Sequence, residues 1–195
     1  GKEMDLSHNQ SVIDFFSSFD KDSYVTIFSF LGIGTVLTFC MQSSAALMAI
    51  TMVLCSSGVL PIYMGIALVL GENIGTTITS NIAAMGANTQ ARRAALAHLT
   101  FNVFGVIWVL CIFYPFIDMV CSFVGVDPHA DHIDATRLSV VLAAFHTTFN
   151  VCNTSILIWL IPQMERFVCY IIKPSAKKDE DDFRLRYIGG TAIMK

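Results

Sequence analysis

The sequence QSS at residues 42–44 and the sequence GENIGTT at residues 71–77 interrupt an apolar run over residues 23–91. Within that run Glu72 is the only aspartate, glutamate, lysine, arginine or histidine. A lipid bilayer requires long apolar segments, and glycines with small polar residues inside such segments are typical of a path for solutes. The two stretches therefore predict a membrane transporter core with its ligand site inside the bilayer.

The composition of the whole chain predicts an all-α integral membrane protein. Of its 195 residues, 54% are hydrophobic and 14% are charged, whereas roughly a quarter are charged in a soluble protein. The apolar runs are continuous rather than alternating, which argues against a β-barrel. No basic stripe indicates nucleic acid, so we expect no nucleic-acid partner. The six cysteines are scattered singly and show no metal-binding spacing.

We expect a re-entrant helical hairpin with residues 42–44 at its tip. Apolar arms of about 15 residues flank the tip without a charged loop, whereas a helix needs about 20 residues to cross a bilayer. Each arm is too short for a comfortable crossing. Both arms would therefore open on the same side of the membrane and hold the tip at membrane depth.

The second stretch predicts a transmembrane helix that is broken near residues 71–75. As one helix, residues 61–88 would be about 42 Å long, which exceeds a hydrocarbon core of about 30 Å. A break at Gly71 and Gly75 would absorb the excess and expose backbone N–H and carbonyl groups to ions. The alternative is that the two glycines form a G-x-x-x-G motif for close helix packing.

Charged loops predict how the rest of the chain is placed. Arg92 and Arg93 mark a cytoplasmic loop, and residues 94–114 form the next crossing, which ends at Pro115. Residues 116–126 are too few to cross and are expected to lie along the interface.

The acidic loop over residues 127–134 suits the outer side of the membrane. Its His129, Asp131 and His132 could be a metal cluster, but a solvated loop is the simpler explanation. Residues 138–163 return through the bilayer, and the lysines from position 173 onward again indicate the inside.

The motif H-x-T-F-N occurs twice and places a histidine and an asparagine on one helix face each time. Two interpretations stay open, a structural hydrogen-bonding role in the bundle core and a supporting role at the ligand site. The residues concerned are His98, Asn102, His146 and Asn150.

The two polar stretches together supply an oxygen-rich set of candidate ligands. Hydroxyl and amide oxygens suit sodium, and hydroxyl and amide donors suit an oxyanion, so both ions could bind together and reduce the cost of moving charge through lipid. Apart from sodium we expect no metal and no cofactor. The candidate binding residues are Gln42, Ser43, Ser44, Asn73, Thr76 and Thr77.

On these residues the chain resembles the type II sodium–phosphate cotransporters, in their bacterial branch. The resemblance covers about residues 24–172 and is carried by QSSA at 42–45, LGENIGTT at 70–77, ARRAA at 91–95 and HLTFN at 98–102. It implies that the six candidate residues bind phosphate and sodium. Ala45 stands where the family pattern usually has a third serine, which removes one hydroxyl ligand.

Members of this family contain two inverted repeats, each with a QSS hairpin. The resemblance implies that residues 23–172 are the second repeat with its following helices, one half of the transporter, whose pocket needs the other repeat. Residues 1–22 would be a polar or amphipathic lead-in, either a helix at the interface or a connection from a preceding segment. Residues 173–195 would be a cytoplasmic linker to a PhoU-like domain that this chain lacks.

The leading functional hypothesis is sodium-coupled symport of inorganic phosphate by alternating access, in a multi-pass protein of the bacterial inner membrane. The alternative is a structural or regulatory membrane module whose polar patches only pack helices. An enzyme is not expected, since a membrane-embedded serine hydrolase would need a G-x-S-x-G elbow and none surrounds Ser43 or Ser44.

Overall fold

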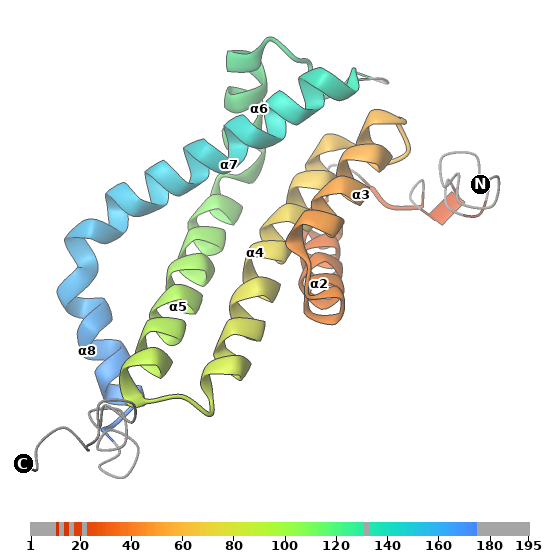
Figure 1. Cartoon of the computed structure of the whole chain (residues 1–195). Coiled ribbons are helices and arrows are strands. Elements are labelled where there is room, and N and C mark those ends of the chain that lie inside the picture. The colour runs from red at the N-terminus through yellow and green to blue at the C-terminus, as the bar shows by residue number, and fades with distance from the viewer. Residues whose placement is uncertain (1–10, 12–13, 16–17, 21–22, 131–132, 175–195) are drawn as a thin grey trace, which may run out of the picture.

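The computed structural model describes residues 11, 14–15, 18–20, 23–130 and 133–174, and within these residues it contains helices and no strand (Figure 1). Four helical segments are long and apolar enough to cross a membrane, which confirms the all-α membrane class. The elements are α2 (Tyr24–Met41), α3 (Ser44–Ser56), α4 (Ile62–Ala84), α5 (Thr89–Cys111), α6 (Phe113–Val124), α7 (Ala135–Leu157), the 3₁₀ helix η3 (Ile158–Leu160) and α8 (Ile161–Ile171).

Helix α4 is the centre of the structure. Every residue from Ile62 to Glu72 is buried, and α2, α3 and α5 all pack against this helix (Figure 1). The remaining candidate spans leave most of their surface uncovered within the chain. The first half of α4 is therefore enclosed by protein up to Glu72, and the rest of the GENIGTT segment is partly buried.

Three glycines allow the backbones of α2 and α4 to touch. A Cβ atom on Gly71 would collide with the carbonyl oxygen of Leu31, and one on Gly75 would lie 2.6 Å from the carbonyl oxygen of Thr35. On the opposite helix, a Cβ atom on Gly34 would collide with the carbonyl oxygen of Leu68. Gly71 and Gly75 thus act as the close-packing motif that was the alternative to a helix break.

The predicted break in the second helix is wrong, because α4 runs continuously from Ile62 to Ala84. Its 23 residues correspond to about 34 Å, close to the thickness of a hydrocarbon core. Residues 85–88, which the prediction counted as helix, form the turn into α5 instead. The excess length that called for a break does not exist.

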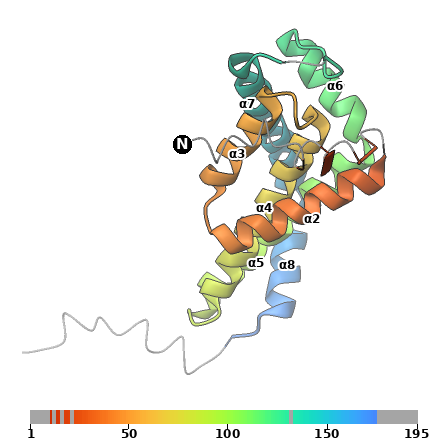
Figure 2. The ribbon, with the colours of Figure 1, turned by 90° about the vertical axis from the view of Figure 1, so that its right-hand side faces the viewer.

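The structure contains a helical hairpin, with α2 and α3 diverging from a turn at residues 42–43 (Figure 2). The expected length of its first arm is wrong, because α2 has 18 residues and is long and apolar enough to cross a membrane, whereas α3 has 13. Its first arm begins near one end of α5, since the Tyr24 ring contacts the Tyr114 ring at a centroid distance of 5.4 Å. Tyr114 also contacts Tyr63 in the first turn of α4, and α3 ends just before α4 begins. Both arms therefore open at the same end of α4, as a re-entrant hairpin requires.

Helices α5 and α6 meet at Ile112, earlier than predicted. Pro115 does not end the crossing but lies in the first turn of α6, where its missing N–H costs nothing. Helix α6 has 12 residues, too few to cross a membrane, as predicted.

Helices α7 and α8 form one bent segment joined by η3. Pro162 has no N–H to donate to the carbonyl of Ile158, four residues earlier, which accounts for the bend. At the far end, the Arg93 Nε donates to the carbonyl oxygen of Ile172 at 3.0 Å. The two segments assigned to the inner side from their charges thus lie together.

Most of residues 1–22 and 173–195, for which a lead-in and a linker were predicted, lie outside the described residues.

We predict that Gly71→Ala lowers the melting temperature of the detergent-solubilised protein, because the new methyl group forces α2 away from α4. The expected loss is about 1–3 kcal/mol of unfolding free energy. Gly32→Ala is the matched control, since nothing lies within 4 Å of a Cβ atom at that position of α2. Equal melting temperatures for the two variants would contradict the close contact.

Candidate functional site

The hairpin tip reverses the chain at Gln42 and Ser43. Gln42 has φ 51° and ψ 26°, and it is the only non-glycine residue with positive φ among the described residues. Its N–H donates to the carbonyl oxygen of Thr38 at 2.8 Å, which ends α2. Ser43 is extended, and its hydroxyl accepts from the N–H of Ala46 at 3.4 Å, which begins α3. A left-handed glutamine is unfavourable by about 1–2 kcal/mol, so the sequence keeps its side chain here at a cost.

The structure joins the two polar stretches at Ser44 and Thr76, whose hydroxyl oxygens lie 2.8 Å apart. Thr76 also donates to the carbonyl oxygen of Glu72 at 2.9 Å. Because a hydroxyl group has one proton, Ser44 must be the donor to Thr76. The tip therefore lies against α4 about two thirds of the way along that helix.

The backbone at the tip offers sites for ions of both signs. Helix α3 begins at Ser44, and the first N–H groups of a helix have no carbonyl partner within it. These groups and the helix dipole favour an anion. Helix α2 ends one residue before Gln42, so its last carbonyl groups face the same turn and favour a cation.

The other predicted ligands on α4 differ in what their side chains contact. The hydroxyl of Thr77 donates to the carbonyl oxygen of Ile74 at 2.8 Å, so its proton is used within its own helix. The side-chain nitrogen of Asn73 is buried and has no hydrogen-bond partner in the described part of the chain. Asn73 precedes Thr76 by three residues and therefore lies on a similar face of α4.

In both H-x-T-F-N motifs the asparagine amide donates to a carbonyl group of its own helix. Asn102 and Asn150 donate to the carbonyl oxygens of His98 and His146, at 3.0 and 2.7 Å, within their own helices. Both histidine side chains are exposed on the surface of this chain, and both interpretations of the motif stay predictions. The spacing in the sequence indicates that the histidine and asparagine of each motif share one face of a helix. It does not indicate which faces of that helix pack against other helices.

Asn153 is a structural polar residue that the sequence analysis missed. It is fully buried, accepts from the Trp108 indole N–H at 3.1 Å and donates to the carbonyl oxygen of Phe101 at 2.9 Å. Gly105 makes room for it, because a Cβ atom there would lie 2.7 Å from the Asn153 amide nitrogen. This residue fastens α7 to α5 away from the hairpin tip.

Three further buried polar groups lie on the two arms of the hairpin and on α4. The hydroxyls of Thr38 and Thr51 and the Oε2 atom of Glu72 are buried, and none has a hydrogen-bond partner among the residues that the structure describes. Such groups are rare in folded proteins, because each loses its water without replacement. Glu72 was visible in the sequence as a lone charge, whereas nothing distinguished the two threonines from packing residues.

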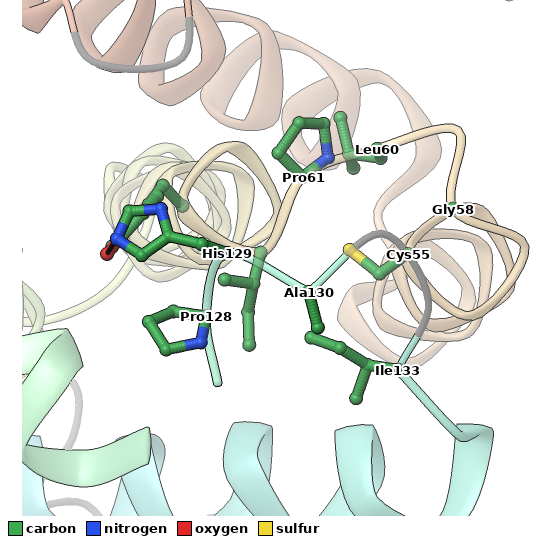
Figure 3. A pocket seen from close by; sticks show the side chains of 10 residues that line it. Cys55, Gly58, Leu60, Pro61, Pro128, His129, Ala130 and Ile133 are labelled. Carbon is green, nitrogen blue, oxygen red and sulfur yellow. Dashed lines mark hydrogen bonds between the residues drawn. The ribbon is translucent and has the colours of Figure 1, made fainter. Parts of the chain in front are cut away.

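A separate cavity of about 220 Å³ lies at the end of the molecule where the hairpin opens (Figure 3). Its lining includes Cys55, Pro61 and His129, which is in the loop for which a metal cluster was considered. The Tyr63 hydroxyl donates to Asp118 and lies 3.4 Å from the His129 Nε2 atom. No group of three metal-ligating side chains occurs in the described residues, and Asp131 and His132 lie outside them.

We predict that Ser44 and Thr76 are energetically coupled. In a double-mutant cycle of Ser44→Ala and Thr76→Val, the unfolding free energies should show a coupling of about 0.5–1.5 kcal/mol. Thr79→Val in place of Thr76→Val is the control, since the Thr79 hydroxyl donates only to the carbonyl oxygen of Thr76. Coupling that is no larger in the first cycle than in the control cycle would contradict the contact.

Comparisons with known proteins converge on one family. A sequence model of the family described as Na+/Pi-cotransporter matches residues 14–125, which include the hairpin, α4, α5 and α6. The uncharacterised protein YqeW of Bacillus subtilis is 40% identical over 96 residues, 49% of this chain and 30% of YqeW. No solved structure was found that matches the chain.

Two other relatives have names that refer to phosphate. The putative inorganic phosphate export protein YjbB of Escherichia coli is 25% identical over 147 residues, 75% of this chain and 25% of YjbB. Human sodium-dependent phosphate transport protein 2C is 38% identical over 82 residues, 40% of this chain and 14% of that protein. The chain thus spans less than a third of the length of each of these relatives.

Proposed function

The chain belongs to the Na+/Pi-cotransporter family, and we propose that it forms part of a carrier that moves inorganic phosphate together with sodium ions across a membrane. The observation that supports this proposal most directly is the contact between Ser44 and Thr76. It unites the hairpin tip and the GENIGTT segment in one place, surrounded by helices that are apolar enough to span a bilayer.

In this proposal phosphate binds at the first turn of α3. The N–H groups there and the hydroxyl of Ser43 are donors that suit an oxyanion, and the Gln42 amide adds another. The Ser44 hydroxyl would join them when its proton turns from Thr76 to the ligand. Because Gln42 is exposed in this chain, its side chain is available to a ligand. Asn73 and Thr76 of α4, with Thr77 beside them, complete the proposed set of phosphate and sodium ligands, and the unpaired Asn73 amide nitrogen is a donor.

Sodium ions would compensate the charge of the phosphate. An anion in an apolar environment is unfavourable unless a cation neutralises it nearby. The last carbonyl groups of α2 and the hydroxyl oxygens at the tip are ligands of the kind that hard cations prefer. The name of human protein 2C refers to sodium-dependent transport, which agrees with this coupling.

We propose that this chain supplies one half of an alternating-access carrier in a bacterial inner membrane. The tip contacts α4 on one side, while Gln42 is exposed on the other, where a second repeat would complete the pocket. Residues 173–195 would continue as the linker to a cytoplasmic domain. YjbB is named for export and 2C for sodium-dependent transport, so phosphate is the substrate common to both names.

The structural or regulatory module remains the second candidate function, because Gly71 and Gly75 do serve packing. The two candidates differ in their response to ligands. A phosphate carrier should show a melting temperature that rises with phosphate only when sodium is present, whereas a packing module should show no such shift.

We predict that Gln42→Ala and Gln42→Gly each lower sodium-dependent uptake of labelled phosphate by tenfold or more in proteoliposomes of the complete protein. Both variants remove the amide, but glycine accepts the left-handed backbone and should leave the protein as stable as the wild type or about 1 kcal/mol more so. A loss in both variants is therefore a loss of the ligand group rather than of the fold.

Gln90→Ala is the control for this experiment, since Gln90 is exposed at the start of α5 and distant from the tip in the sequence. It should transport like the wild type. Unchanged uptake in the two Gln42 variants would remove Gln42 from the site.

A further inference from the structure

Glu72 is a buried carboxylate without a charged partner. Its exposed fraction is 6%, and its Oε2 atom has no hydrogen-bond partner within the part of the chain that the structure describes. Helices α2, α3 and α4 contain no lysine, arginine or histidine. A buried carboxylate with an unpaired oxygen is strongly unfavourable as an anion, so the folded protein must neutralise it, either with a bound cation or with a proton.

The cations of α5 lie too far along α4 to serve this purpose. Asn81 of α4 donates to the carbonyl oxygen of Ala95, which places Arg92 and Arg93 beside the last turns of α4. Asn81 follows Glu72 by nine residues, or about 13 Å of helix. The side chain of His98 is exposed on the surface of the chain. The packed helices thus offer no protein cation to Glu72.

The remaining unpaired oxygens come from the two arms of the hairpin and lie against the same face of α4. Thr38 of α2 packs on Gly75, where its Cβ atom would be 2.9 Å from an added Cβ, and Thr51 of α3 packs on Gly65. Positions 65, 72 and 75 differ by seven and three residues and therefore share one side of the helix. Both threonine hydroxyls are buried and without a partner in the described chain.

We propose that Glu72 is a ligand of a coupling sodium ion held between the hairpin and α4, with the hydroxyl of Thr38 as a second ligand. The inference rests on the proposed function and assigns one of its ion sites. A hard monovalent cation prefers carboxylate and hydroxyl oxygens and would satisfy both groups together. A proton would neutralise Glu72 but leave the Thr38 hydroxyl without a partner.

The position of Glu72 connects this ion to the phosphate site. Its backbone carbonyl accepts from Thr76, and Thr76 accepts from Ser44 at the hairpin tip. An ion between α4 and the hairpin would therefore hold the tip against α4 from within. Sodium bound at Glu72 would therefore organise the tip for the anion, and by linkage bound phosphate would raise the affinity for sodium.

The test compares Glu72→Gln with the wild type in proteoliposomes of the complete protein, with Glu165→Gln as control. Glu165 is an exposed carboxylate on α8, so its substitution removes the same charge outside the site. Phosphate uptake is measured against sodium concentration at several pH values. We expect Glu72→Gln to raise the half-saturating sodium concentration at least tenfold and to abolish the rise in melting temperature that sodium alone produces.

Thr38→Val provides a second arm, because it removes the hydroxyl and keeps the volume. It should raise the half-saturating sodium concentration about threefold, so the proposal stays testable even where Glu72→Gln does not fold. An unchanged sodium dependence in both variants would overturn the site. If phosphate uptake by Glu72→Gln kept its sodium dependence but lost its pH dependence, Glu72 would be a proton-binding group. That result would also overturn the sodium site. A wild-type protein without sodium-dependent uptake would instead contradict the proposed function.

Discussion

The direct contact between the backbones of α2 and α4 is the interaction on which the rest of the structure depends. Gly34, Gly71 and Gly75 remove the side chains that would hold the two helices apart. In lipid no hydrophobic force drives helices together, so association relies on close van der Waals contact and on hydrogen bonds such as that from Thr35 to the carbonyl oxygen of Gly71 at 3.1 Å. This contact fixes the depth at which the hairpin lies along α4.

The same contact explains why polar groups can gather within an apolar bundle. With the helices this close, the side chains of Thr38 and Glu72 and the amide nitrogen of Asn73 are buried. Their unpaired atoms reduce stability unless ions bind them. A packing module would gain from apolar residues at these positions, whereas a carrier needs groups that exchange their ligands. The buried unpaired atoms therefore favour the carrier over the module.

Much of the architecture followed from the sequence, because the bilayer imposes it. The long apolar runs predicted the helices, and the short arms around residues 42–44 predicted the hairpin. The lengths of the helices are predicted less well than their positions, because the residues at which a helix begins and ends are hard to identify. The expected helix over residues 61–88 includes residues 85–88, which form a turn, and this excess length led to the break that α4 does not have. Glycines in a helix have two uses, and only the positions of Leu31 and Thr35 show that these serve packing.

The site was predictable to the extent that polar residues stand out in an apolar segment. The sequence indicated that Ser44 and Thr76 belong to one site, and the structure shows their contact. It did not indicate Thr38 or Thr51, because a threonine on a membrane helix usually bonds to its own backbone and looks the same in the sequence. It also did not reveal that His98 and His146 are exposed, since periodicity does not identify the partner of a helix face.

The central claim is that the hairpin tip is seated on α4 beside Thr76, and cysteine cross-linking tests it most directly. The paired substitutions Ser44→Cys and Thr76→Cys would be made in the complete protein after its native cysteines are replaced, and an oxidant would be added in membranes. We expect rapid cross-linking of this pair, because the two side-chain oxygens that the sulfur atoms replace lie 2.8 Å apart. The pair Ser44→Cys with Ser139→Cys, on α7, should remain reduced. Failure of the first pair to cross-link, or equal cross-linking of both pairs, would contradict the account.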